Sequence, residues 1–296
     1  MKTLRNAVIA IFAGLILMIS CKKSDIALPK SEANIDSIAS KYYEGYLKMY
    51  PLEATMQGDS RYNDLLSNNI SSEFISKEIE FYTDTQKKLK SIDYDDLSDE
   101  QKTVYDVLDY TLKDKIERYA YHPELLPFSQ FEGLPLDFPL LGSAEGNQPF
   151  KTTKDYDNWL KRIDAFVIWM NTAEKNFREG MKQNVVLPKK LVVKMIPQMH
   201  SEEIITEDFD KNIFYGPIKK MPKNFSAKDK EKYKILYQEA ISSKIIPAYQ
   251  KMGDFLEKEY LPKARNTDGI NALPNGKNIY EYYAKSWTTT NKTPEE

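Results

Sequence analysis

Residues 155–182 read DYDNWLKRIDAFVIWMNTAEKNFREGMK, and this stretch decides the fold. An α-helix has about 3.6 residues per turn, so side chains three or four positions apart share one face. The apolar side chains of the stretch keep this spacing throughout, at Trp159, Ile163, Phe166, Met170, Ala173, Phe177 and Met181. We therefore expect one long helix whose apolar stripe packs against a core made of further helices.

Helical periodicity also dominates the rest of the chain, and patterns typical of strands are nearly absent. Ser98 and Gln101 have the spacing of a capping box, and an apolar stripe that includes Val104 follows them. The chain should kink or divide at Pro247, and residues 184–187 form at most a short edge strand. Helices are expected over residues 35–50, 72–92, 98–121, 189–205, 226–246, 247–260 and 278–287. The prediction is an all-α fold, an irregular array of helices with long loops rich in proline and glycine.

Two of the predicted loops are unusually apolar. Residues 122–149 contain five prolines and three glycines together with a run of leucines, so we expect this loop to pack onto the body of the protein. Residues 209–225 hold the aromatic side chains of Phe214 and Tyr215, and we interpret this second loop as a surface lid.

Composition indicates an ordered protein with no affinity for nucleic acid. Apolar residues make up 41 % of the 296 residues, with 20 tyrosines and 13 phenylalanines, which is enough for a sizeable core. The net charge is −2 and the two signs are mixed along the chain, so no basic stripe suggests a nucleic-acid partner.

The N-terminus has the pattern of an exported bacterial lipoprotein. Lys2 and Arg5 precede the uncharged, mostly apolar run of residues 7–19, which would span about 20 Å as a helix and is too short to cross a bilayer. The run ends at Ser20 and Cys21, which resemble a lipobox. We predict a signal peptide at 1–20, lipidation of Cys21 and a tether at 21–30, hence a lipid-anchored protein of the bacterial cell envelope. The alternative is an incidental cysteine in an uncleaved anchor.

A metal site of the zinc-peptidase type is not visible in the sequence. The two histidines, His122 and His200, are far apart, whereas a His-Glu-x-x-His motif needs two of them one helical turn apart. His200 and Glu203 have a spacing that can share one metal, but a surface helix position is the simpler interpretation. His122 is expected at a helix end, near the negative pole of the helix dipole. We therefore assign no catalytic and no metal-binding residue.

The polar segment around residues 58–64 is the best candidate for contacts with a substrate. Arg61 can clamp a peptide carboxylate and Tyr62 can donate to a carbonyl, so we name these two as substrate-binding candidates. The alternative is a structural Arg61–Asp59 ion pair beside a buried tyrosine. Residues 288–290 are three threonines. They could hydrogen-bond to the backbone of a substrate. The alternative is that they form a turn or a helix cap.

Four motifs in order carry a resemblance to a known family. They are PLEATMQGDSRYND at residues 51–64, SDEQKTVYDVL at 98–108, the segment 155–193, and the closing segment 259–296 with EYLPKAR, ALPNGKNIY, TTT and TPEE. Together they resemble the bacterial family known as domain of unknown function 885. The resemblance implies a mostly helical, zinc-metallopeptidase-like protein whose histidine motif lies in a second half that follows TPEE.

The closing residues fit that interpretation. Thr293 is a good N-cap, Pro294 suits the first helical position, and two acidic residues favour the positive end of the dipole. We therefore expect residues 31–296 to be the N-terminal half of the family domain and one wall of a peptidase-like cleft. The expected partners are a peptide substrate, the membrane and a C-terminal half that holds the zinc. The alternative is a non-catalytic helical envelope lipoprotein that binds peptide or glycan.

Overall fold

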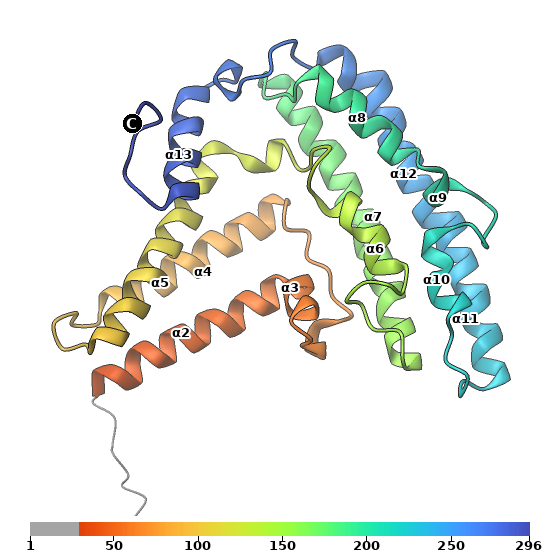
Figure 1. Ribbon diagram of the computed structural model, residues 1–296, viewed down its shortest axis with the longest axis horizontal. Coiled ribbons are helices and arrows are strands. Elements are labelled where there is room, and N and C mark those ends of the chain that lie inside the picture. Colours follow the sequence, from red (N-terminus) through yellow and green to blue (C-terminus); the bar gives the residue numbers. More distant parts are fainter. Residues whose placement is uncertain (1–29) are drawn as a thin grey trace, which may run out of the picture.

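The computed structural model describes residues 30–296, and the predicted signal peptide, Cys21 and most of the tether lie outside these residues. The described part is all-α and contains no strand, which confirms the predicted fold class. Figure 1 shows its helices arranged as an arch with two arms. None of these helices has a stretch that is both long and apolar enough to cross a membrane.

The first arm is built from α2 (Lys30–Met49), α4 (Ser72–Lys90) and α5 (Asp99–Arg118), with the short α3 (Pro51–Met56) at its inner end. Both hydrogen bonds of the predicted capping box form between Ser98 and Gln101 at the start of α5. One member of the predicted stripe on α5 is wrong: Val104 is 39 % exposed, and its neighbour Tyr105 is buried instead. The side chains of this smaller core are Ile35, Tyr82, Leu89, Leu97, Tyr105, Leu108 and Leu112.

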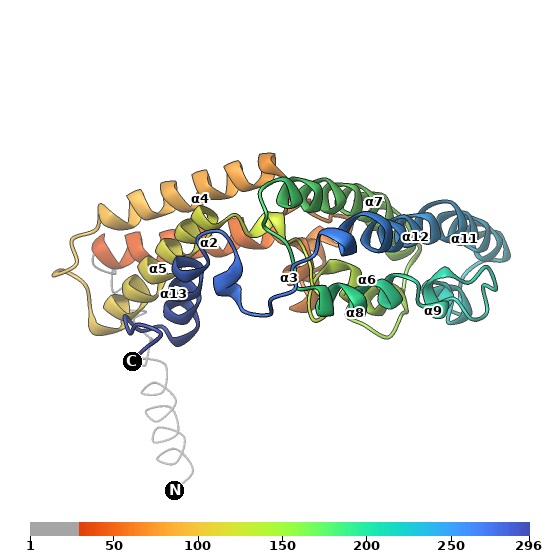
Figure 2. The same cartoon turned by 90° about the horizontal axis from the view of Figure 1, so that it is seen from above.

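The second arm is organised around α7 (Thr153–Lys182), the helix over residues 155–182 that the sequence predicted. Its stripe from Trp159 to Phe177 is buried, and Met181 at its end is partly buried. Figure 2 shows α7, α12 and α11 in one layer and α6, α8 and α9 in a second. The remaining elements of this arm are α6 (Leu134–Gly142), α8 (Lys189–Met199), α9 (Glu202–Ile205), α10 (Gly216–Lys219), α11 (Ala227–Ala240) and α12 (Ile246–Phe255).

Helices α11 and α12 form one long helical stretch. Pro247 lies in the first turn of α12 and follows a widened, π-helical turn at Ile241–Ile245, and a second such turn lies at Leu256–Tyr260. A proline has no N–H to donate and its ring collides with the carbonyl four residues earlier in a regular helix. The wider turn makes room for this ring, so the chain continues instead of dividing.

The apolar segment expected as a loop contains a helix. Helix α6 runs through Pro135 and Pro139, and Phe138 stacks on Phe166 of α7 with ring centroids 4.0 Å apart. The loop prediction was therefore wrong for residues 134–142, although the expected packing onto the body is confirmed. Pro135 is tolerated because the first turn of a helix needs no N–H donors, and burial of Phe138 stabilises the short helix against the bond lost at Pro139.

Two further predictions need correction. The lid expected at residues 209–225 contains α10, and Phe214 is fully buried, so this segment is part of the core. The helix expected over 189–205 is divided into α8 and α9 at His200. Residues 184–187 form no strand, in agreement with the expectation of at most a short edge segment, and an isolated bridge joins Pro188 and Arg265.

Helix α13 (Gly276–Thr288) returns the chain to the first arm, where it lies beside α5 (Figures 1 and 2). Lys285 forms an ion pair of 3.1 Å with Glu117, and Tyr282 donates to the carbonyl oxygen of Asp114 at 3.3 Å. Beyond α13, Thr293 and Glu296 exchange two hydrogen bonds, as expected of an N-cap residue and its partner.

Candidate functional site

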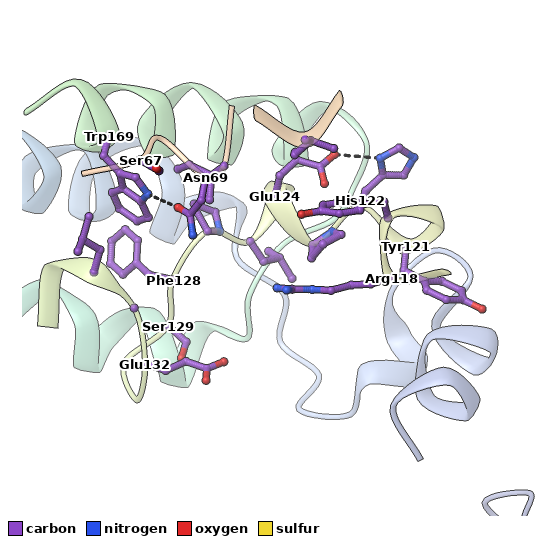
Figure 3. Close-up of a pocket in the computed structure, with 18 of the residues that line it drawn as sticks. Ser67, Asn69, Arg118, Tyr121, His122, Glu124, Phe128, Ser129, Glu132 and Trp169 are labelled. Atoms are coloured by element: carbon purple, nitrogen blue, oxygen red, sulfur yellow. Dashed lines mark hydrogen bonds and ion pairs between the residues drawn. The ribbon is translucent and has the colours of Figure 1, made fainter. Parts of the chain in front are cut away.

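A cavity of about 580 Å³ lies where the two arms meet, and it is the main candidate for a functional site. Its walls come from the inner ends of α2 and α3, the end of α5, the segment 119–134, the start of α6, Trp169 of α7, and residues 270–283. The volume falls within the range of about 300–1,000 Å³ that small-molecule sites occupy. Figure 3 shows that charged and aromatic side chains face this space from different elements.

One side of the cavity is apolar and firmly held. Phe128 is buried, and its ring centroid lies 6.3 Å from that of Trp169. The indole N–H of Trp169 donates to the Asn69 side-chain oxygen at 2.9 Å, a contact visible in Figure 3. A fixed indole and phenyl ring form a surface against which an apolar ligand group can pack.

The two cations of the cavity come from the last turn of α5. Lys115 and Arg118 are three residues apart and therefore lie on one face of the helix. Neither side chain forms a hydrogen bond or an ion pair with another described residue, which leaves their charges available to a ligand. Figure 3 shows Arg118 reaching into the cavity.

Acidic side chains line other parts of the same cavity. Glu132 and Asp137 flank the start of α6, and Glu53 belongs to α3. The pKa of Asp137 is raised, first because the surrounding protein removes part of its hydration and second because Glu132 carries the same charge. Uncompensated charge of this kind is typical of sites that bind ligands or perform chemistry.

His122 and Glu124 form a pair at the rim. His122 has a left-handed backbone with φ of 51°, directly after the helical turn Tyr119–Tyr121, so the predicted position at a helix end is confirmed. Its Nδ1 atom lies 3.0 Å from Oε1 of Glu124. The second carboxylate oxygen of Glu124 is buried and has no hydrogen-bond partner among the described residues.

A buried carboxylate ties two walls of the cavity together. Glu78 of α4 accepts hydrogen bonds from the hydroxyls of Tyr50, Tyr82 and Tyr119, and two of these tyrosines line the cavity. Burial and the negative charge of Glu78 hold the pKa of Tyr50 far above its ordinary value, so its hydroxyl keeps its proton and remains a donor. Glu78 thereby fixes side chains from two different segments in one arrangement.

Arg162 of α7 anchors the segment that leads from α3 into the cavity wall. Its fully buried guanidinium donates to the Leu65 carbonyl at 3.0 Å, to the Thr55 hydroxyl at 2.7 Å, and to the side-chain oxygen of Gln148. Burial lowers the pKa of Arg162 to about 10. These bonds satisfy a buried cation with neutral oxygens and hold residues 51–66 against the second arm.

The predicted substrate contacts Arg61 and Tyr62 are not among the residues that line this cavity. Arg61 forms ion pairs of 2.6 Å with both Asp59 and Glu44, and its guanidinium carbon lies 5.3 Å from the ring centroid of Tyr62. The structural alternative, an Arg61–Asp59 bridge, is therefore present. Binding of substrate by Arg61 and Tyr62 stays a prediction.

The three threonines form a turn, as the second interpretation had it. The Thr288 hydroxyl donates to the carbonyl of Ala284 at 2.7 Å, and Thr289 has a left-handed backbone with φ of 53° that ends α13. Thr290 lies within hydrogen-bond distance of the Thr288 hydroxyl, at 2.9 Å. All three threonines are exposed and none of them lines the cavity.

One cluster on the second arm has ligand types that suit a metal ion. His200, Asp254 and Glu257 each offer one ligand atom, and these atoms lie within 4.8 Å of one another. Nε2 of His200 lies 4.0 Å from a carboxylate oxygen of Asp254, and the cluster contains a single histidine. Asp254 is also engaged by Lys258 at 2.9 Å. The chain's other histidine, His122, lies at the inter-arm cavity, so the described residues do not fit the His-Glu-x-x-His chemistry that the resemblance implies.

Sequence reasoning missed the charged residues of the cavity. Lys115 and Arg118 look like ordinary cations at the end of a helix, and Glu132 and Asp137 look like polar positions in a loop. Their convergence depends on how the two arms meet, which leaves no local pattern.

Comparisons with known proteins support the assignment of fold and family. The chain is similar to a crystal structure described as "the putative lipoprotein from Colwellia psychrerythraea", with a TM-score of 0.71 and 17 % sequence identity. The match covers 90 % of this chain and 47 % of that one, so this chain spans about half the length of its structural relative. No curated protein matches the sequence. The model of the family described as bacterial protein of unknown function, DUF885, matches residues 51–296, and the chain therefore belongs to the DUF885 family.

Proposed function

We propose that this chain is the substrate-binding part of a metallopeptidase-like protein of the bacterial envelope, and that a peptide binds in the cavity between the arms. The observation that carries the proposal is the cavity itself, in which unpaired cations and carboxylates face a fixed aromatic wall. Such a mixture suits a peptide, which offers charged termini, backbone polar groups and apolar side chains.

The metal-dependent step belongs, in this proposal, to sequence that this chain does not span. The proposal is supported by the two histidines, which lie too far apart in the sequence to form a His-Glu-x-x-His motif, and by the structural relative, of which the match covers 47 %. The chain supplies one wall of the cleft and holds the peptide in place, which is how positioning residues lower the barrier of a reaction carried out by other groups.

Attachment to the membrane through Cys21 is a further part of the proposal. It rests on the apolar run that ends at Ser20 and Cys21, and Cys21 is the single cysteine of the chain. A palmitate analogue should label the wild-type protein, while Cys21→Ala should give an unlabelled species. Labelling that persists in Cys21→Ala would show that the lipid is attached elsewhere.

The function is tested with the complete product of the reading frame that contains this chain. We expect it to hydrolyse members of a fluorogenic peptide library, and a chelator to abolish the activity. A frame that closes after Glu296, with no partner gene beside it, would favour the second candidate, a non-catalytic envelope lipoprotein that binds peptide in the same cavity. Hydrolysis that persists in chelator would contradict the metallopeptidase assignment.

A further inference from the structure

We propose that the cavity between the arms recognises short peptides with two free ends, Arg118 binding the terminal carboxylate and Glu132 with Asp137 binding the terminal ammonium group. The inference rests on the proposed function, because it names the substrate class of the same cavity. Recognition of both ends makes the protein selective for small, dipolar peptides over internal segments of long chains.

The first step is the separation of charge. Both cations lie on the last turn of α5 in the first arm, whereas Glu132 and Asp137 lie at the start of α6 in the second arm. Figure 3 shows Arg118 and Glu132 entering the cavity from these different elements. A ligand in the cavity therefore meets positive charge from the end of α5 and negative charge from the start of α6.

The second step is the availability of these charges. No hydrogen bond or ion pair with a described residue involves the side chains of Arg118, Lys115, Glu132 or Asp137. Surface charges elsewhere on the protein are commonly paired, as in the Arg178 bridge to Glu259 at 2.8 Å. Unpaired groups of both signs facing one cavity are complementary to a dipolar ligand.

The third step is the match between each group and its ligand end. An arginine guanidinium offers a planar fork of donors that binds a carboxylate through two parallel hydrogen bonds. An ammonium group is a compact cation with three donors, and a pair of carboxylates accepts these well. Lys115, one turn before Arg118, adds positive charge at the carboxylate end.

Two further carboxylates line the cavity. One oxygen of Glu124 lies 3.0 Å from Nδ1 of His122. Glu53 of α3, at the inner end of the first arm, adds a third carboxylate that is unpaired among the described residues. The apolar wall of Phe128 and Trp169 is placed to receive a side chain of the peptide.

The experiment uses calorimetry with the full chain and the tripeptide alanine-leucine-alanine in three forms: free, N-acetylated and C-amidated. Blocking either end should weaken binding about tenfold or more, because each block removes a charge-assisted contact. Arg118→Gln should weaken the free and the acetylated peptides by a similar factor and leave the amidated peptide unchanged. Glu132→Gln should show the mirror pattern and spare the acetylated peptide.

Matched variants separate recognition from folding. Arg118→Lys keeps the charge without the planar fork and should bind with intermediate affinity. Lys228→Gln, on exposed α11 outside the cavity, should bind all three peptides like the wild type. Equal affinity for the three peptides would overturn the inference, as would equal weakening of all three by Arg118→Gln, or the absence of binding by the free tripeptide at millimolar concentration.

The outcome is distinguishable from a failure of the proposed function. If the complete gene product hydrolyses long or blocked peptides while tripeptides do not bind, the function stands and the two-ended recognition is wrong. If free tripeptides bind as described while the complete product shows no chelator-sensitive hydrolysis, recognition stands and the peptidase assignment fails.

Discussion

Glu78 is the residue on which the shape of the cavity most depends. It is almost fully buried and accepts hydrogen bonds from three tyrosines, one between α2 and α3, one on α4 and one in the turn after α5. A buried carboxylate is costly to desolvate unless its oxygens are well supplied with donors, and three hydroxyls meet that need. The same bonds place Tyr50 and Tyr119 in the cavity wall, so one acidic residue joins the core of the first arm to the site.

Removing this carboxylate should be strongly destabilising. Glu78→Ala leaves three hydroxyls in the interior without their acceptor, and we expect the free energy of unfolding to fall by about 3 kcal/mol or more. Glu78→Gln retains an acceptor and most of the shape and should cost less. The measurement is urea denaturation followed by circular dichroism, with exposed Glu80→Ala on the same helix as a control expected within about 0.5 kcal/mol of wild type. Similar losses for Glu78→Ala and Glu80→Ala would contradict the role of this cluster.

Individual residues were predictable from the sequence where their partners are local. The Arg61–Asp59 bridge and the Ser98–Gln101 capping box involve neighbours two and three positions apart, and both are present. Arg162 was not predictable, because a single arginine in an amphipathic helix normally lies on the solvent side. Its burial depends on the Leu65 carbonyl and on Gln148, which other segments supply.

At the scale of elements, α7 determines the second arm. Its stripe was read correctly from spacing alone, because a helix of this length repeats the pattern many times. Helix α6 was missed, because two prolines within nine residues hide a helix whose stability comes from the packing of Phe138. The break between α8 and α9 was also missed, although Pro197 lies three residues before it within α8.

The stripe of α7 can be tested at its centre. Phe166 is fully buried and stacks on Phe138, so Phe166→Ala should lower the free energy of unfolding by about 3–5 kcal/mol. Ile168 lies two positions away on the same helix and is 59 % exposed, so Ile168→Ala should be close to neutral. Urea midpoints give both values. Equal shifts for the two variants would mean that the stripe does not form the core.

The contact between α7 and the wall of the cavity depends on Gly180. A Cβ atom at this position would lie 2.9 Å from the carbonyl oxygen of Leu125 and 2.6 Å from that of Val185, and backbone atoms cannot easily move away. Gly180→Ala should therefore destabilise the protein by about 1–3 kcal/mol, although alanine favours a helix. Gly269→Ala is the control, since its Cβ meets nothing within 4 Å. Thermal denaturation that shows no loss for Gly180→Ala would contradict this close approach.

At the scale of the whole molecule, the sequence predicted the fold class and the family resemblance but not the cavity. The two arms have separate cores, and their meeting point is lined by segments from residue 46 to residue 283. No local pattern encodes contacts over such distances along the chain. The arrangement also explains why candidates chosen for local polarity, such as Arg61 and Thr288, lie outside the cavity lining.

Zinc binding can be tested on the full chain. It should not bind zinc at submicromolar dissociation constant, because the cluster of His200, Asp254 and Glu257 contains a single histidine and one oxygen of Asp254 is already paired with Lys258. Calorimetric titration with zinc measures this directly, and His200→Ala should leave the titration nearly unchanged. Stoichiometric tight binding that His200→Ala removes would place a metal site on the second arm and require a different account of this protein.

The central claim is that peptide binds between the arms, and photo-crosslinking tests it most directly. A short peptide whose leucine carries a diazirine would be irradiated with the full chain, and the modified residues would be located by mass spectrometry. We expect the label on residues of the cavity wall, above all Tyr121, Phe128 and Leu134, and competition by unlabelled peptide. Competed label concentrated on Arg61 and Tyr62, or on residues 288–290, would contradict the claim.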